Sequence, residues 1–383
     1  MASRAGEEVF VQSLTKLLQN YGDSVLSGTS TLSLLTVGLQ VLHQLFEQHL
    51  LARKYQHGFV ALPSHPSDTA SVLDVQFLFD VLQKTVSLKL AHPPGPSLQT
   101  PVRIFAFKSL RFLELKQVPP HCLEGLRGVY TRLEILVCSR CIHTVEEIIS
   151  VCGGDLSSAL PWLDLHTLNF SNNFITSLDS SLGLLNVLRT LDLSHNQIRD
   201  CAENLKLLAE LEYVNLSYNI LEKVPVFNPC SRVQLVTLLL RNNELEDISG
   251  LEHLTHLKCL DLAFNMISKH GSLAQLSHLH RLKELFLEGN PVYYQRNHRA
   301  STIYHLSPKA AFLRLVLDGE ALTMADLTNL PKSGRLLSHT GRHSPRNSML
   351  KNVLESSISS EQNDRQHSPD GIGGTLMRKK VNV

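Results

Sequence analysis

The chain has 383 residues, 43% of them hydrophobic and 19% charged, with 36 Lys and Arg against 35 Asp and Glu. This length allows one large or two medium domains with a buried core, and the balanced charge argues against nucleic acid or an anionic membrane as the main partner. No run of about 18 apolar residues predicts a transmembrane segment, and no secretory signal opens the sequence. Because the seven cysteines are scattered, we expect reduced thiols and a cytoplasmic protein.

Residues 1–100 are predicted to be mostly helical, because apolar side chains recur there at helical spacing. The three stripes are Phe10, Leu14, Leu17, Leu18 and Tyr21; Leu39, Leu42, Leu45, Phe46 and Leu50; and Leu73, Phe77 and Val81. We expect the first helix to stop at Gly22 and Asp68 to cap the start of the third. A further strand is predicted at Thr85, Leu88 and Leu90. This region is interpreted as a helical N-terminal cap on the repeats that follow, rather than an independent binding module.

Residues 101–292 repeat the pattern Leu-x-x-Leu-x-Leu-x-x-Asn-x-Leu, which is typical of leucine-rich repeats. The repeat asparagines lie 23, 23, 24, 22 and 25 residues apart, at Asn173, Asn196, Asn219, Asn243, Asn265 and Asn290. Two degenerate copies place Val118 and Cys141 at the asparagine position. The longer step from Cys141 to Asn173 contains Val145, Ile148, Ile149 and Cys152 at helical spacing, which predicts a longer helix on the convex side.

The expected fold class is therefore α/β: a leucine-rich-repeat solenoid, curved as a horseshoe, with a parallel concave sheet and short convex helices. One turn cannot bury its own leucines, so neighbouring turns stack and share a core. An asparagine amide can satisfy the backbone groups left unpaired where the chain bends after each strand. The six asparagines are therefore predicted to form one buried structural row.

The two segments after the repeats differ in composition. Residues 293–330 are predicted to be a C-terminal repeat cap, in which an apolar helical segment runs to Phe312 and on to Gly319. Residues 331–383 contain nine serines and no aromatic residue, with nine Lys and Arg against four Asp and Glu. Such a segment cannot bury enough apolar surface to offset the entropy of ordering, so we expect a disordered tail.

No residue pattern indicates catalysis. The pair Cys138 and Cys141 lacks a second pair to complete a zinc site, and the repeat register favours core packing for both thiols. The histidines form no ligand motif, and no phosphate-binding loop, nucleophile elbow or kinase signature is present. We therefore predict a protein that is not an enzyme and needs no cofactor or metal.

The concave face is the surface predicted to bind a partner. Its outward residues are expected to be Glu114, Val137, Asn169, Asp192, Asn215, Leu239, Asp261 and Phe286, with Phe112, His195, Tyr213, Tyr218, Arg241, Asn242, Phe264 and Glu284 beside them. Aromatic residues and Arg are enriched at protein interfaces. The partner-binding candidates are Asp192, His195, Tyr213, Tyr218, Leu239, Arg241, Phe264 and Phe286.

Several segments resemble the family of serine/threonine kinase 11-interacting proteins, and nischarin has similar repeats. The segments are Val25–Gly28, Ser30–Thr36, Gly58–Pro66, Phe77–Thr85, Cys152–Asp155 and Leu285–Pro291, and the match continues to about Leu327. The resemblance implies a cytoplasmic adaptor that binds serine/threonine kinase 11 and influences where that kinase resides. It assigns no contact residues. Family members continue past the repeats, so we expect this chain to be a fragment or a short isoform.

Three functions follow in order. The first is an adaptor that docks the kinase on the solenoid. The second is a regulatory subunit of a phosphatase or another enzyme, because the repeat from Leu245 to Leu257 and the C-terminal cap resemble short repeat proteins of the phosphatase-regulator and spliceosomal type. The third, assembly with RNA, is weaker because residues 1–330 carry 27 Lys and Arg (36 − 9) against 31 Asp and Glu (35 − 4).

Overall fold

The computed structural model describes residues 4–50, 70–95, 97–150, 161–201, 203–332 and 379–382. All of these except Lys332 belong to one compact unit. Asp68, Cys152 and the segment 333–378 of the expected tail lie outside the described residues. In the part of the chain described, no helix is both long and apolar enough to span a bilayer.

The main sheet has 13 strands among the described residues, in the order β14-β13-β12-β11-β10-β9-β8-β7-β6-β4-β2-β1-β15. Neighbours are parallel except β13 and β14, which are antiparallel. The strands are β1 (Ser30–Leu35), β2 (Ser87–Ala91), β4 (Phe112–Lys116), β6 (Ile135–Ser139), β7 (Thr167–Asn169), β8 (Thr190–Asp192), β9 (Tyr213–Asn215), β10 (Thr237–Leu239), β11 (Cys259–Asp261), β12 (Glu284–Phe286), β13 (Val316–Leu317), β14 (Glu320–Ala321) and β15 (Lys379–Asn382). Two further strands, β3 (Val102–Arg103) and β5 (Leu123–Glu124), pair separately.

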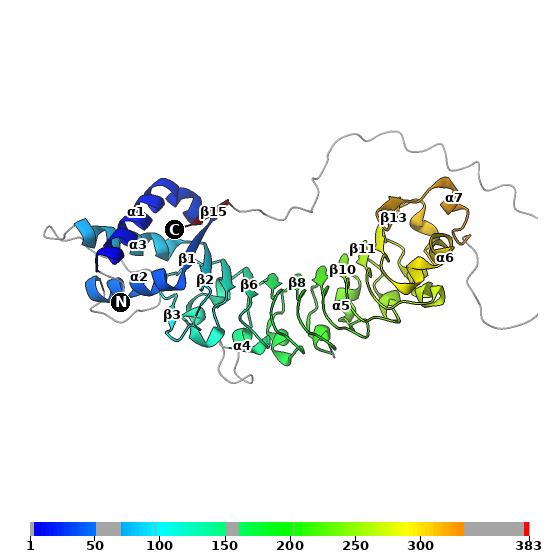
Figure 1. Ribbon diagram of the computed structural model, residues 1–383, viewed down its shortest axis with the longest axis horizontal. Helices are drawn as coiled ribbons and strands as arrows, with labels where there is room; N and C mark the ends of the chain where they lie inside the picture. The colour runs from blue at the N-terminus through cyan, green and yellow to red at the C-terminus, as the bar shows by residue number, and fades with distance from the viewer. Residues whose placement is uncertain are drawn as a thin grey trace, which may run out of the picture. The chain divides into compact units, whose positions relative to one another are not determined.

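Helices cover the convex side and both ends of the sheet. The α-helices are α1 (Arg4–Leu26), α2 (Thr36–His49), α3 (Ala70–Lys84), α4 (Glu146–Ile149), α5 (Pro229–Arg232), α6 (His298–Tyr304) and α7 (Met324–Leu327). Single 3-10 turns are η1 (Pro120–Cys122), η2 (Leu126–Gly128), η3 (Tyr130–Arg132), η6 (Ser180–Leu184), η7 (Asn204–Leu207), η8 (Leu251–His253), η10 (Pro291–Tyr294) and η11 (Pro308–Ala310), with a longer η9 (His270–His278). In Figure 1 the strands line the inner side of the arc, and α4 and α5 lie on its outer side.

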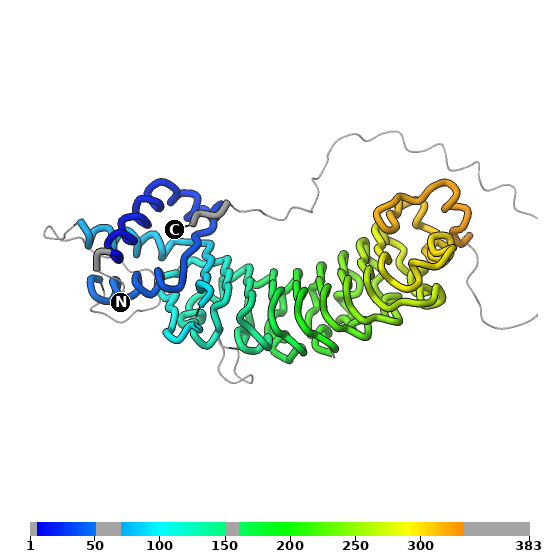
Figure 2. The backbone as a smooth tube through the Cα atoms, in the orientation of Figure 1, coloured from blue at the N-terminus to red at the C-terminus, as the bar shows by residue number. Residues whose placement is uncertain are grey.

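The predicted solenoid is confirmed, since one coil stacks on the next along the repeats (Figure 2). The inward leucines of every turn lie in one continuous hydrophobic core. All six repeat asparagines are buried, between 0% and 9% exposed. The Nδ2 of Asn219 donates to the carbonyls of Leu216 and Leu193, each at 3.0 Å, and its Oδ1 accepts the Ile198 N–H at 3.0 Å. Each asparagine therefore joins its own turn to the preceding one, as predicted.

The N-terminal region departs from the sequence expectation in two ways. Strand β1 was not predicted, because its sequence carries no repeat asparagine, whereas the predicted strand at Leu88 and Leu90 is confirmed as β2. The expected helix stop at Gly22 was wrong. Helix α1 continues to Leu26, and the turn that ends it uses the left-handed Gly28, whose φ is 75°.

Two other expectations need correction. The long convex helix before Asn173 is a single turn, α4, as far as the described residues go. The segment from Phe312 to Gly319 is not a helix end: Val316 and Leu317 form β13, which extends the sheet, and Phe312 is exposed. Backbone pairing to the last repeat strand outweighs local helix propensity there. Within the range expected to be disordered, residues 379–382 form β15.

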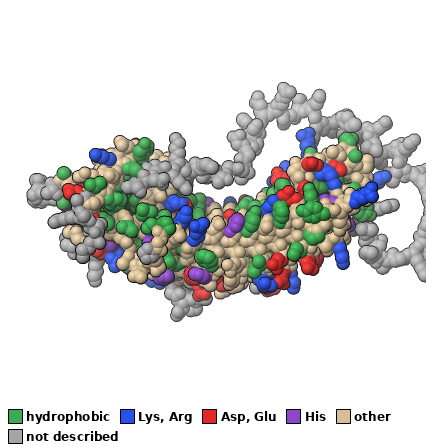
Figure 3. Space-filling model, in the orientation of Figure 1, with side chains coloured by type: hydrophobic (Ala, Val, Ile, Leu, Met, Phe, Trp, Pro, Cys, Tyr) green, Lys and Arg blue, Asp and Glu red, His purple; other side chains and the backbone are tan. Residues whose placement is uncertain are grey.

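The described surface is uneven in character. On the face drawn in Figure 3, hydrophobic side chains gather over the N-terminal helices, and charged side chains gather over the C-terminal turns and cap.

Candidate protein-binding site

Strand pairing aligns the predicted outward residues in one row across the concave sheet. From β4 to β12 the partners run Glu114, Val137, Asn169, Asp192, Asn215, Leu239, Asp261 and Phe286. All eight are half-buried, flanked by leucines and other residues buried in the core. Because strands alternate their side chains between two faces, this row confirms the register read from the sequence.

A second row follows from backbone conformation. The residue before each repeat asparagine is left-handed, with φ between 54° and 58° at Asn172, His195, Tyr218, Asn242 and Phe264, and 75° at Gly289. Asparagine, histidine and glycine tolerate this conformation better than bulky residues do, and a bulky residue held there is a reason to look for function. Tyr218 and Phe264 are the bulky exceptions, with 43% and 45% of their surface exposed.

The two exposed aromatic rings are each held by a neighbour. The ring of Tyr218 stacks on His195, with centroids 4.2 Å apart and planes 9° from parallel. The ring of Phe264 lies against Gly289, where an added Cβ would be 2.5 Å from the ring. The guanidinium carbon of Arg241 sits 4.8 Å from the centroid of the Phe264 ring on its other contact, a cation–π geometry. Both rings are therefore exposed but fixed in position.

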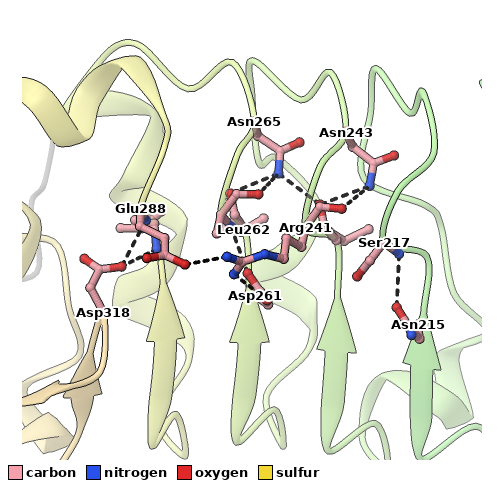
Figure 4. A network of polar contacts seen from close by, with 12 residues as sticks. Asn215, Ser217, Arg241, Asn243, Asp261, Leu262, Asn265, Glu288 and Asp318 are labelled. Atoms are coloured by element: carbon pink, nitrogen blue, oxygen red, sulfur yellow. Dashed lines mark hydrogen bonds and ion pairs between the residues drawn. The ribbon is translucent and has the colours of Figure 1, made fainter. Parts of the chain in front are cut away.

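Arg241 is the centre of a polar network that spans three repeats (Figure 4). Its guanidinium donates to Glu288 at 2.5 Å and to Asp261 at 3.4 Å. Glu288 lies two strands away, and the small, buried Ala263 occupies the intervening position, which lets the arginine side chain pass over it. The Oδ1 of Asp318 accepts the N–H groups of Leu287 and Glu288 at 2.6 and 3.0 Å. Asp318 thus holds the backbone beside Glu288 in place.

Burial shifts the pKa values of groups on this face. Burial acts to lower the pKa of Arg241, but Glu288 and Asp261 outweigh it, so the pKa is raised and the side chain stays charged. Burial raises the pKa of Asp261, although the Ala263 N–H and Arg241 oppose this. The pKa of Tyr213 is raised by burial and by Asp192 and Cys259. Burial and Glu284 raise the pKa of Cys259 to about 12.

The structure brings some predicted site residues together and leaves others apart. Arg241 and Phe264 are in contact, and Tyr218 contacts His195. Leu239 and Phe286 occupy the same row but are separated by Asp261. Sequence reasoning missed Glu288, Gly289 and Asp318 as members of the site. For Gly289 a signal was available, because it is the repeat position at which Tyr218 and Phe264 stand.

The two cysteines weighed as a metal or redox pair lie in the hydrophobic core. Burial and the neighbouring thiol of Cys141 raise the pKa of Cys138 well above its ordinary value. Among the residues that the structure describes, no cluster of three or more His, Cys, Asp or Glu side chains is arranged to hold a metal ion.

Comparison with known proteins matches two kinds of family to different parts of the chain. The family described as LKB1 serine/threonine kinase interacting protein 1 matches residues 5–94. Leucine-rich-repeat families match residues 187–208 and 233–269. The first range contains α1–α3, β1 and β2, so the kinase-interacting family is recognised by the N-terminal cap and the solenoid by its repeats.

Curated relatives match much more of the chain. A serine/threonine-protein kinase 11-interacting protein of Gallus gallus is 54% identical over 382 residues, covering 99% of this chain and 36% of the relative. The Homo sapiens protein of that name is 52% identical over 316 residues, covering 82% of this chain and 29% of the relative. This chain therefore spans about a third of the length of these relatives. A solved leucine-rich-repeat protein of Leptospira interrogans aligns with TM-score 0.47 and 19% identity, over 76% of this chain and 79% of that one.

Proposed function

We propose that this chain, whose resemblance to the serine/threonine kinase 11-interacting proteins is confirmed along nearly its whole length, is a non-catalytic adaptor that binds a serine/threonine protein kinase on its concave sheet. The relatives are named for such an interaction. The observation that supports the concave sheet is the pair of exposed aromatic rings, Tyr218 and Phe264, held at left-handed positions beside Arg241.

The physical argument rests on preorganisation. Ordering a flexible side chain at an interface costs about 0.5–1.5 kcal/mol. Stacking on His195 already restricts Tyr218, and contact with Gly289 and Arg241 already restricts Phe264. Rigid aromatic and arginine side chains are the residues that most often dominate binding energy at protein interfaces. We therefore place the binding hot spot over β9–β12.

The test is binding of purified chain 1–383 to immobilised serine/threonine kinase 11. Tyr218→Ala and Phe264→Ala should each weaken the Kd about tenfold or more, which corresponds to about 1.4 kcal/mol. Tyr304→Ala and Phe312→Ala are matched controls, because these aromatic side chains are at least as exposed but lie in the C-terminal cap. The controls should leave the Kd unchanged.

Two results would count against the proposal. Equal Kd values for all four variants would remove the concave sheet from the interaction. No binding of the kinase, together with binding of a phosphatase catalytic subunit in the same assay, would favour the regulatory-subunit alternative.

The proposal also covers location: the chain acts in the cytoplasm and influences where its kinase resides. Imaging of the tagged chain together with the tagged kinase tests this. The kinase distribution should shift when the wild-type chain is expressed and should not shift with Tyr218→Ala/Phe264→Ala.

A further inference from the structure

The two ends of the main sheet are closed differently. At the C-terminal end, β14 turns back antiparallel on β13. At the N-terminal end the outermost strand of the cap is β1, six residues long, with β2 on one side. Its sequence, Ser-Thr-Leu-Ser-Leu-Leu, contains no charged residue and no proline. Proteins normally protect an edge strand with charges, proline or a bulge, so the free side of β1 is suited to accept another strand.

A strand from far along the chain lies on that free side. β15 pairs with β1 in parallel, with Ser30 opposite Lys379, Leu32 opposite Val381, and Ser33 opposite Asn382. The pairing covers the first four residues of β1 and stops before Leu34 and Leu35. In Figure 1 the label of β15 stands beside that of β1, at the outer end of the sheet.

The uncovered end of β1 borders an apolar pocket of about 260 Å³. Its walls include Leu34 and Leu35 of β1, Phe10 of α1, and Val37, Gly38 and Val41 of α2. No described residue of β2 lines it, so the pocket is not on the side of β1 that β2 covers. In the observed register, a strand on this edge that continued past the position of Asn382 would reach Leu34 and Leu35.

We propose that the free edge of β1 and this pocket form a strand-acceptor site, and that its occupant is the chain's own segment Lys379–Asn382. Backbone hydrogen bonds along the edge supply affinity, and the pocket selects an apolar side chain that follows the paired residues. This is the physics of peptide recognition by strand addition. The site lies within the residues matched by the kinase-interacting family and is separate from the concave sheet.

Hydrogen exchange tests the occupant in the full chain. Deleting residues 378–383 should speed exchange of the β1 amides that face β15 by about tenfold or more, while the amides of β8–β11 keep their rates. Adding a synthetic peptide with the sequence of residues 378–383 should restore the protection. Circular dichroism and the Tm control for folding of the deletion variant.

Peptide binding tests the strand geometry. The labelled peptide should bind the deletion variant, and should bind the intact chain at least about tenfold more weakly, because the tethered segment competes at a high effective concentration. Parallel pairing uses the backbone groups of alternate residues. Prolines at either 379 and 381 or 380 and 382 should therefore abolish binding, and the other pair should be tolerated. Val37→Asp in the pocket should weaken binding without changing exchange in β1.

Unchanged β1 exchange in the deletion variant, absence of peptide binding, or equal loss with both proline pairs would overturn the proposal. Protection that falls on dilution, with a doubled mass at high concentration, would overturn the intrachain occupant in favour of a second copy.

Discussion

The N-terminal turns and the later repeats build one sheet by two different means. Each strand from β7 to β12 has three residues, and the buried asparagine of its turn bonds it to the preceding turn. The strands β1, β2, β4 and β6 have five or six residues, and no asparagine stands at the ladder position after β4 or β6. Where the side-chain ladder is missing, backbone pairing continues two residues further. A sheet of this kind can therefore satisfy its backbone through side chains or through longer strands.

The largest expected effect is in the ladder. Asn219→Ala removes three short hydrogen bonds in the core and should lower the free energy of unfolding by about 2–3 kcal/mol, since buried backbone groups lose their partners. Urea denaturation measures it. Asn186→Ala, an exposed asparagine in the same block of repeats, should change stability by less than about 0.5 kcal/mol. A small effect at Asn219 would mean that the ladder is dispensable and the comparison is wrong.

The second effect separates backbone strain from packing in the last repeat. Gly289→Ala places a Cβ against the Phe264 ring and forces alanine to a φ of 75°, whereas Gly319→Ala has a φ of 82° but open space. We expect Gly289→Ala to cost about 1–2 kcal/mol more than Gly319→Ala. Adding Phe264→Ala should remove most of that excess, as a double-mutant cycle would show. Additive effects would show that Phe264 does not rest on Gly289.

A smaller effect is expected in the N-terminal cap. The hydroxyls of Thr31 and Ser87 lie 2.8 Å apart and join β1 to β2, where the repeats use asparagine. Thr31→Val should lower the free energy of unfolding by about 1 kcal/mol. The double variant with Ser87→Ala should be no less stable than Thr31→Val alone. A loss as large as that of Asn219→Ala would show that the cap depends on side chains as much as the repeats do.

The smallest change affects reactivity rather than stability. With a pKa of about 12, Cys259 is about one part in ten thousand thiolate at pH 8. Its alkylation should therefore be slow although the side chain is half-buried rather than fully buried. Cys230 is exposed and should react first. Mass mapping of each cysteine peptide after timed iodoacetamide treatment measures both rates. Equal rates would contradict the electrostatic description of the concave face.

The repeats were predictable because their period fixes which residues point inward. Spacing alone gave the six asparagines, the leucine core and the outward row from Glu114 to Phe286. The period could not show that Arg241 reaches Glu288, because that contact depends on the small size of Ala263 between them. Nor could it place β1, whose sequence has no repeat signature, or extend α1 past Gly22, since one glycine is tolerated inside a helix of 23 residues.

The residues of the candidate site were therefore accessible from sequence as positions, and their interactions were not. Tyr218 and Phe264 were recognised as outward aromatic residues. Their left-handed backbone, the stack on His195 and the rest on Gly289 come from three-dimensional contacts between turns.

The most direct test of the concave-sheet assignment is a hydrogen-exchange footprint of chain 1–383 with and without saturating serine/threonine kinase 11. Slower exchange confined to the turns of β9–β12, residues 213–218, 237–242, 259–264 and 284–289, is the expected result. Slower exchange confined to the convex helices or to α1–α3, with these turns unchanged, would contradict the assignment.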